Sequence, residues 1–517
     1  MTSLTASQSD PADVMTPQNL ESGFSESTGS SRSAFAADSL MVGMLAMLIM
    51  TVLQRGLGFG RGVLFCRLMS DVDVGSLSMA YDFIVMFTPI AMLGIPGSLA
   101  RYVETYRREN RAGQLVRRLA MITGALGITL VLGLLLARRS FAYWIFLSAD
   151  RVDLVVTIAA GVAAIVAFNF TYELLASLRQ VRAASWMQFI QSVGFSILGV
   201  VWLLLGGGLV GLLSVFAAVT IFAMVPASII LKRGWHDLDN ACSPASNDSI
   251  WRRVLPYAGA LWMMNLLTNA FTMSDRYLIL HAMPGGDETV RAAIGQYHSA
   301  RLIPLLLTSL AAMVSGVLLP YLSADWESSR REQVVATLKR ALVGVSVLFT
   351  IGGGITLTFA PWLFESFLEN RYSQGLALMP MAMAMCIYAA LAIVGQDYLW
   401  VAEKGKWVAV ATGIGLSINI ALTLLWLPSM GLSGAVLATL IANQMVLCVL
   451  WAIMHAAGFR IDLSIIVISI LPATLLAGGP VATACGVIAA YVLPQAGEAV
   501  VQFGNHPKIS PLLRRRL

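Results

Sequence analysis

The sequence predicts an all-α polytopic membrane protein with about 14 transmembrane helices, built as two six-helix lobes related by an internal parallel repeat plus a C-terminal hairpin. Of 517 residues, 57% are hydrophobic and only 12% are charged, with a mean hydropathy of +0.76. This is the composition of a membrane protein. Apolar segments of about 20 residues, the length that crosses a bilayer as a helix, recur along the chain.

Twelve apolar spans come first, separated by short polar joints. They cover 39–66, 76–100, 113–137, 154–178, 182–205, 208–231, 255–281, 293–320, 333–360, 376–401, 406–427 and 431–457. The next apolar run, 463–493, is too long for one ordinary span and is interrupted by Gly478-Gly479-Pro480, so we expect a hairpin of two short helices. We expect the polar residues 1–38 to form a disordered cytoplasmic tail, and 494–517 a basic cytoplasmic tail.

An internal repeat divides these spans into two halves. Three markers recur at offsets of 220 to 223 residues. They are Gly75-x4-Ala80 with Gly295-x4-Ala300, Trp186 with Trp407, and Gly208-Leu209-x-Gly211 with Gly431-Leu432-x-Gly434. Because each half has an even number of spans, both point the same way across the membrane. The predicted units are an N-terminal lobe at 39–232, a cytoplasmic inter-lobe loop at 233–254 and a C-terminal lobe at 255–457.

The distribution of Lys and Arg predicts the orientation, because these residues are retained on the cytoplasmic side. The joints after every second span, together with both tails, hold 24 of the 34. The opposite joints hold six, namely Arg67, Arg138, Arg139, Arg151, Arg291 and Arg371. We therefore expect both termini to be cytoplasmic. The inner joint Arg101–Arg118 also suits the anionic headgroups of membrane lipids.

Charged residues inside the spans are the candidate substrate-binding residues, because a charge at membrane depth costs about 2.5–3.5 kcal/mol. They are Arg55, Arg61, Asp82, Asp275, Arg276 and Arg301. Four cations against two acids leave a positive excess that an anionic substrate could neutralise. The guanidinium fork of arginine matches phosphoryl oxygens. Alternating glycines, Gly56 to Gly62, would let the first span bend, admit a close neighbouring helix and leave room for its two arginines.

A purely structural reading of the same residues stays open. In it, Arg55 pairs with Asp82, Arg276 pairs with Asp275 or across the lobes, and Arg61 reaches the outer interface. Two further acids, Glu173 and Asp397, lie near the cytoplasmic ends of equivalent spans. They are candidates for an inner gate or for proton coupling, and ordinary solvation at a helix end is the alternative.

Aromatic residues and missing motifs complete the sequence-based expectations. Sugar-stacking candidates, which could equally pack at the membrane interface, are Tyr81, Tyr277, Tyr297 and Trp262. There is no GxxxxGK[ST], HExxH or GxSxG motif, and the five cysteines have no metal-ligand spacing. We expect no enzymatic activity, cofactor, metal or nucleic-acid partner.

The stretch 55–106 resembles the N-terminal signature of bacterial polysaccharide flippases, members of the multidrug/oligosaccharidyl-lipid/polysaccharide exporter superfamily. Further matches lie at 274–280, 295–300, 417–422 and 428–435. The resemblance implies alternating access by two lobes around a cationic cavity in the inner membrane. The implied substrate is an undecaprenyl-diphosphate-linked oligosaccharide for surface polysaccharide biosynthesis, and the implied candidate partners are a polysaccharide polymerase and chain-length proteins.

Two alternatives share the scaffold. The lipid II flippases of the superfamily carry cavity arginines in helices 1, 2 and 8, and Arg55, Arg61 and Arg301 fit the first and last of these helices. The second span has Asp82 instead of an arginine, which counts against a lipid II role. A cation-coupled multidrug exporter would favour buried acids, which the excess of arginine opposes. A membrane enzyme of polysaccharide assembly would need an outer domain for which the joints are too short.

Overall fold

The computed structural model describes residues 40–108, 111–239, 248–369 and 371–493, and over these ranges the chain forms helices and no strand. The two predicted tails, 1–38 and 494–517, lie outside the described residues. So does part of the predicted inter-lobe loop, 240–247. Ten of the described helical segments are long and apolar enough to cross a membrane, and two shorter apolar helical segments follow near the C-terminus.

The N-terminal lobe contains nine helices within the described ranges. They are α1 (Leu40–Leu68), α2 (Asp71–Met92), α3 (Ile95–Arg108), α4 (Ala112–Leu136), α5 (Arg138–Phe146), α6 (Val152–Ser177), α7 (Val181–Leu204), α8 (Leu209–Ala223) and α9 (Val225–Asp239). The short α5 falls in a stretch expected to be a plain joint.

The C-terminal lobe follows the same plan. It contains α10 (Asp248–Ala282), α11 (Asp287–Arg301), α12 (Pro304–Glu327), α13 (Arg331–Leu368), α14 (Ser373–Gly395), α15 (Asp397–Val401), α16 (Lys406–Met430) and α17 (Leu432–Ala456). The predicted hairpin consists of α18 (Leu463–Ile470), a 3-10 helix (Leu471–Ala477) and α19 (Gly479–Val492), with the chain turning at Gly478, where φ is 107°.

Four spans expected to be single helices, 76–100, 208–231, 293–320 and 376–401, are each broken in two, the last at Gln396 between α14 and α15. Between α2 and α3 the chain passes through Leu93 and Gly94, both with positive φ. Two further breaks precede Pro226 and Pro304. Proline disfavours a helical conformation in the residue before it and lacks the amide hydrogen that continues a helix, so the sequence itself carries the signal for these two breaks.

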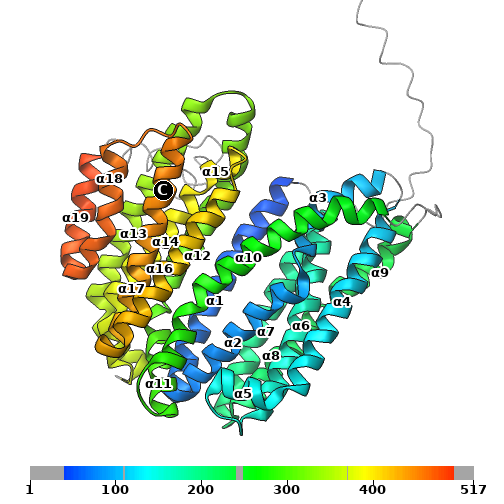
Figure 1. The fold of residues 1–517 in the computed structure, drawn as a ribbon, viewed down its shortest axis with the longest axis horizontal. Helices are drawn as coiled ribbons and strands as arrows, with labels where there is room; N and C mark the ends of the chain where they lie inside the picture. Colours follow the sequence, from blue (N-terminus) through cyan, green and yellow to red (C-terminus); the bar gives the residue numbers. More distant parts are fainter. Residues whose placement is uncertain (1–39, 109–110, 240–247, 370, 494–517) are drawn as a thin grey trace, which may run out of the picture.

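The two lobes meet at one end of the molecule and diverge at the other (Figure 1). We call the end that contains α5 and α11 the joined end, and the opposite end, where α3, α9 and α15 lie, the diverging end. The long α10 runs between the lobes. Its first half packs on α3, where a Cβ on Gly94 would overlap the carbonyl oxygen of Ala258. Its second half packs on α16 of its own lobe.

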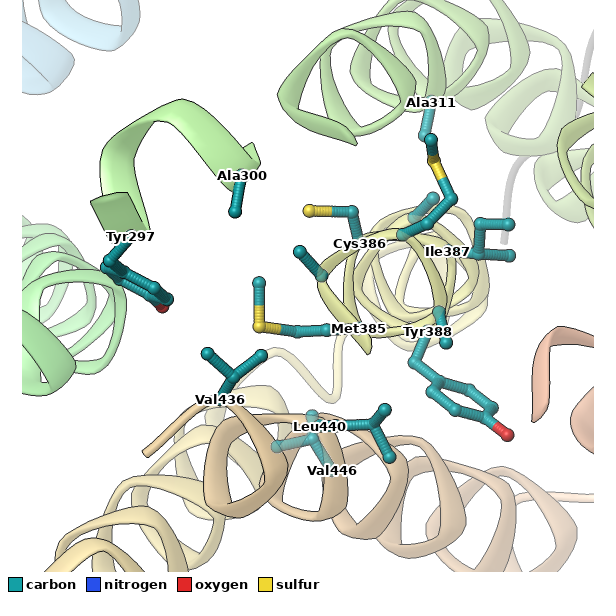
Figure 2. Close-up of a cluster of buried hydrophobic side chains, with 14 of the residues drawn as sticks. Tyr297, Ala300, Ala311, Met385, Cys386, Ile387, Tyr388, Val436, Leu440 and Val446 are labelled. Carbon is teal, nitrogen blue, oxygen red and sulfur yellow. The ribbon is translucent and has the colours of Figure 1, made fainter. Parts of the chain in front are cut away.

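The core of the C-terminal lobe is built around α14. Figure 2 shows Met385 extending from α14 toward Ala300 on α11 and Val436 on α17. These side chains are all buried, with Leu440 and Cys386 beside them. Because this apolar cluster is buried, any polar group on the adjacent helices faces an apolar environment from which water is excluded.

Candidate functional site

The first buried ion pair joins the two lobes. Arg276 on α10 donates a hydrogen bond to the carboxylate of Asp82 on α2, and both side chains are about one-tenth exposed or less. The purely structural reading of the sequence allowed Arg276 to pair with a residue of the other lobe, and this pairing is observed. Arg55 does not pair with Asp82. A buried pair of this kind is held together by the low dielectric around it, since separating the charges would leave each one desolvated and unpaired.

The second buried cluster is centred on Asp275 of α10. Its Oδ2 accepts a hydrogen bond from the hydroxyl of Tyr297 at 2.5 Å and lies 3.8 Å from Nη1 of Arg301. Its Oδ1 accepts hydrogen bonds from Asn419 and Thr439, both at 2.7 Å. The carboxylate is therefore satisfied by side chains from α11, α16 and α17, and it ties together four helices of the C-terminal lobe.

A further layer of side chains orients these donors. Thr423 donates to the side-chain oxygen of Asn419 at 2.9 Å, and Asn443 donates to the backbone carbonyl of Thr439 at 2.9 Å. The guanidinium of Arg301 also lies over the ring of Tyr297, 5.1 Å from its centroid. This network fixes the amide of Asn419 in one orientation, because its oxygen is already engaged by Thr423.

Both buried arginines keep unused donor capacity. The Nε atoms of Arg276 and Arg301 have no hydrogen-bond acceptor among the described residues, although both atoms are buried. A buried unsatisfied N–H is costly, and arginine can present several donors to one anion. These two Nε atoms are therefore donors without an acceptor among the described residues.

The two arginines of α1 have different surroundings. Arg61 lies over the ring of Phe195 on α7, 4.7 Å from its centroid. Arg55 is exposed and has no ion pair among the described residues. A Cβ on Gly56, Gly58 or Gly60 would meet no atom within 4 Å, so the expected close neighbouring helix is absent at these positions. Only the next glycine, Gly62, is approached closely, by the side chain of Leu302.

The joined end is closed by backbone contacts between helices of the two lobes. A Cβ on Gly75 of α2 would overlap the carbonyl oxygen of Arg291 on α11, and a Cβ on Gly295 of α11 would overlap the carbonyl oxygen of Asp71 on α2. Only glycine allows two helix backbones to approach this closely. The repeat markers Gly75 and Gly295 thus meet each other in the folded protein.

Cations of the predicted outer joints add polar contacts at the same end. Arg291 donates to the carbonyl of Phe146 at 2.6 Å. Arg67 on α1 pairs with Glu369 at 3.5 Å, across the lobes. The hydroxyl of Tyr372 donates to the carbonyl of Cys66 at 3.0 Å, also across the lobes, and burial raises the pKa of Tyr372, which keeps it protonated as a donor.

The remaining predicted residues lie apart from this charge network. Asp397, at the start of α15, is 1% exposed and accepts a hydrogen bond from Ser315 at 2.8 Å, while its second oxygen has no partner among the described residues. Glu173 is half-buried near the end of α6. Of the aromatic candidates, Tyr277 packs against Trp144, with ring centroids 5.2 Å apart and the ring planes tilted by 32°.

Sequence reasoning missed the polar residues of α16 and α17 that bind Asp275. Asn419 and Thr423 are four apart, as are Thr439 and Asn443, so each pair shares one helix face. Two polar pairs inside otherwise apolar spans were the available signal. They lie more than 140 residues from Asp275, and their shared target follows only from the packing of the helices.

Comparison with known proteins identifies the family of this chain. A family model described as "Polysaccharide biosynthesis protein" matches residues 40–326, more than half of the chain. The uncharacterized membrane protein YabM of Bacillus subtilis (strain 168) is 21% identical over 427 residues, covering 77% of this chain and 76% of that protein.

Solved structures share the fold at low sequence identity. The lipid II flippase MurJ in an inward closed conformation aligns with a TM-score of 0.66 and 14% identity, covering 87% of this chain and 97% of that one. An inward-facing MATE-family multidrug resistance transporter of the MOP superfamily aligns at 0.63 with 15% identity, covering 80% and 98%. A MOP-superfamily transporter from Pyrococcus furiosus, described as having a binding pocket of reversed polarity, aligns at 0.58 with 16% identity, covering 82% and 96%.

The predicted all-α polytopic membrane fold is confirmed, with ten candidate membrane spans within the described residues. The chain therefore belongs to the polysaccharide biosynthesis protein family, as a multi-pass membrane protein with the fold of the MOP-superfamily flippases and transporters.

Proposed function

We propose that the protein is a flippase that moves undecaprenyl-diphosphate-linked oligosaccharides from the inner to the outer leaflet of the plasma membrane for surface polysaccharide biosynthesis. The observation that carries the proposal is the location of the positive excess. Asp82 and Asp275 pair with Arg276 and Arg301, which leaves Arg55 and Arg61 without an acidic partner among the described residues. Both unneutralised cations are on α1.

Arg55 is the first ligand in this proposal. It is exposed on α1, and the three glycines Gly56, Gly58 and Gly60 after it face open space, so a bulky head group can approach the helix there. Its guanidinium can form two parallel hydrogen bonds to a phosphoryl group. Arg61 extends the positive surface along the same helix toward the joined end.

The buried arginines supply the next ligands. A diphosphate that reaches Arg301 finds the free Nε donor and competes with Asp275 for the guanidinium, which lies 3.8 Å from that carboxylate. Arg276 offers the same exchange with Asp82. Because Asp82 and Arg276 belong to different lobes, binding of the anion would weaken a contact that holds the lobes together. This links occupancy to the change in lobe orientation.

The orientation follows from the loop charges. The α3–α4, α6–α7 and α12–α13 joints, each of which contains an arginine, lie at the diverging end. We place that end in the cytoplasm. The head group then enters between the lobes from the cytoplasm and leaves at the joined end after the glycine contact opens. Glu173 and Asp397, both near the cytoplasmic end, are our candidates for the inner gate or for proton coupling.

The test is transport by purified protein in proteoliposomes loaded with a fluorescent undecaprenyl-diphosphate oligosaccharide, followed by the accessibility of the glycan to a quencher outside. Arg55→Ala should slow flipping about 10–100-fold, because a charge-assisted hydrogen bond contributes about 1.5–3 kcal/mol. Arg139→Ala is the matched control, since Arg139 is exposed on α5 at the joined end. Wild-type rates for both Arg55→Ala and Arg61→Ala would contradict the proposal.

The same vesicles separate the two alternatives. A cationic-drug exporter needs an acid that can bind a cation, whereas both acids of the candidate substrate-binding set, Asp82 and Asp275, are engaged by arginine. We expect no efflux of cationic dye. Replacing the oligosaccharide by the head group of lipid II tests the second alternative, and we expect the oligosaccharide carrier to be flipped faster.

A further inference from the structure

A cavity of 660 Å³ opens at the joined end of the N-terminal lobe, away from the intramembrane charges. It lies between the α5–α6 turn and the α7–α8 turn, and its wall includes Trp202 and four charged side chains, Asp73, Asp150, Arg151 and Asp153. Its volume is within the range of about 300–1,000 Å³ typical of small-ligand pockets.

The tryptophan of this cavity is held in place by glycines. Trp202 is 38% exposed, and its indole nitrogen donates a hydrogen bond to the carbonyl of Gly208 at 3.1 Å. A Cβ on Gly207 or Gly211 would overlap the indole ring, so the ring rests directly on the backbone of the α7–α8 turn. Because the indole N–H is already bonded, what Trp202 offers to a ligand is an apolar aromatic surface in a fixed position.

The acids beside the ring are free to accept hydrogen bonds. Asp150 and Asp153 are exposed and have no hydrogen-bond donor among the described residues, whereas Asp73 accepts from the hydroxyl of Ser70 at 2.8 Å. An ionised carboxylate only accepts hydrogen bonds. Three carboxylates against the single arginine give the lining a net negative charge, which repels phosphate and anionic lipid headgroups.

The corresponding turn of the C-terminal lobe lacks a tryptophan that rests on glycines. The repeat aligns Gly208 with Gly431, so Gly207 corresponds to Met430. A methionine therefore stands in the sequence where the N-terminal lobe has one of the glycines against which the Trp202 ring rests. The fold therefore forms this turn without a tryptophan resting on glycines. Of the two equivalent turns, the one in the N-terminal lobe has the fixed aromatic surface.

We propose that this cavity is a glycan subsite that binds uncharged or amino-bearing sugar units through Trp202, Asp150 and Asp153. A sugar ring combines an apolar face, which packs on an indole, with several hydroxyl donors at its edge, which match the carboxylates. The cavity is at the joined end, where the proposed function releases the head group. The inference rests on the proposed function for the source of the glycan, while binding itself can be measured without transport.

The experiment uses the full-length protein in lipid nanodiscs and saturation-transfer NMR with three probes, maltotriose, a neutral N-acetylglucosamine trimer and trigalacturonate. We expect the two neutral probes to bind and the anionic probe to bind about tenfold more weakly or not at all. Trp202→Leu and, separately, Asp150→Asn should each lower affinity for the neutral probes about five- to tenfold. Trp186→Leu is the control, since Trp186 is an exposed tryptophan near the other end of α7.

Two outcomes would overturn the subsite. They are failure of all probes to bind wild-type protein, and equal binding by wild-type protein and both variants. If Trp202→Leu misfolds, the Asp150→Asn variant still tests the subsite, because Asp150 is exposed. Glycan binding by a wild-type protein that does not flip the lipid-linked probe would contradict the proposed function and leave the subsite standing. Flipping of the lipid-linked probe by a wild-type protein that binds no glycan probe would contradict the subsite and leave the proposed function standing.

Discussion

Gly75 and Gly295 contact each other's helices reciprocally at the join between the lobes. A Cβ on Gly75 would lie 3.1 Å from the backbone nitrogen of Gly295 and would overlap the carbonyl oxygen of Arg291, four residues before it. A Cβ on Gly295 would overlap the carbonyl oxygen of Asp71, four residues before Gly75. Two residues related by the sequence repeat thus form a local two-fold contact, and both helices depend on a missing side chain to make it.

Replacing either glycine by alanine should open the joined end. The added methyl group overlaps a backbone carbonyl that cannot rotate away, so α2 and α11 must separate. In a variant that keeps Cys66 as its single cysteine, which is fully buried in this structure, we expect Gly75→Ala and Gly295→Ala to increase labelling by a membrane-impermeant maleimide about tenfold or more. Gly124→Ala, where a Cβ meets no atom within 4 Å, should leave labelling unchanged. Unchanged labelling in the first two variants would show that the join is not held at these glycines.

Tyr372→Phe should weaken closure without adding bulk. It removes the donor to the carbonyl of Cys66 and leaves that carbonyl unsatisfied, a loss of about 1–3 kcal/mol. Because burial raises the pKa of Tyr372, the hydrogen bond contributes fully below the ordinary tyrosine pKa of about 10 and is lost only as the pH rises beyond it. Maleimide labelling of Cys66 should therefore be faster in the variant than in the parent. The ratio of the two rates should stay constant from pH 6 to 9, because the rise of thiol reactivity with pH is common to both proteins. A ratio that changes steeply over that pH range would contradict this.

Breaking the inter-lobe ion pair from one side should destabilise the protein more than removing both charges. Asp82→Asn leaves Arg276 buried without a counter-charge. Arg276→Gln likewise leaves Asp82 buried without a counter-charge. Each single change should cost about 3–5 kcal/mol. The double variant should recover part of this loss. Thermal unfolding of the four proteins in detergent gives the coupling energy as a double-mutant cycle, and additive effects would mean that the pair contributes no mutual stabilisation.

Tyr297→Phe should lower stability, whereas Tyr277→Phe should not. The hydroxyl of Tyr297 donates to Asp275 at 2.5 Å, so its removal leaves one carboxylate oxygen short of a donor, which costs about 1–3 kcal/mol. The buried hydroxyl of Tyr277 has no hydrogen-bond partner among the described residues, so its removal should be neutral or slightly stabilising. Detergent melting temperatures compare the two variants directly. Equal losses would indicate that packing of the phenol ring, rather than its hydrogen bond, determines both effects.

The fold was largely predictable because hydropathy and charge act locally. Any apolar segment of about 20 residues must hydrogen-bond its own backbone in a membrane, so helices form where the composition says they do. The breaks in four of these spans were the main differences. Gly94, Pro226 and Pro304 mark three of them, whereas the start of α5 within a joint has no comparable signal.

The sequence by itself determined which residues needed an explanation, and the tertiary structure decided their partners. An arginine within an apolar span is expensive wherever it lies, so Arg55, Arg61, Arg276 and Arg301 could be identified from composition alone. Whether each one is neutralised depends on the distance to an acid on another helix, which the packing of the two lobes sets. The structure pairs Arg276 and Arg301 with Asp82 and Asp275, and it leaves the positive excess on α1.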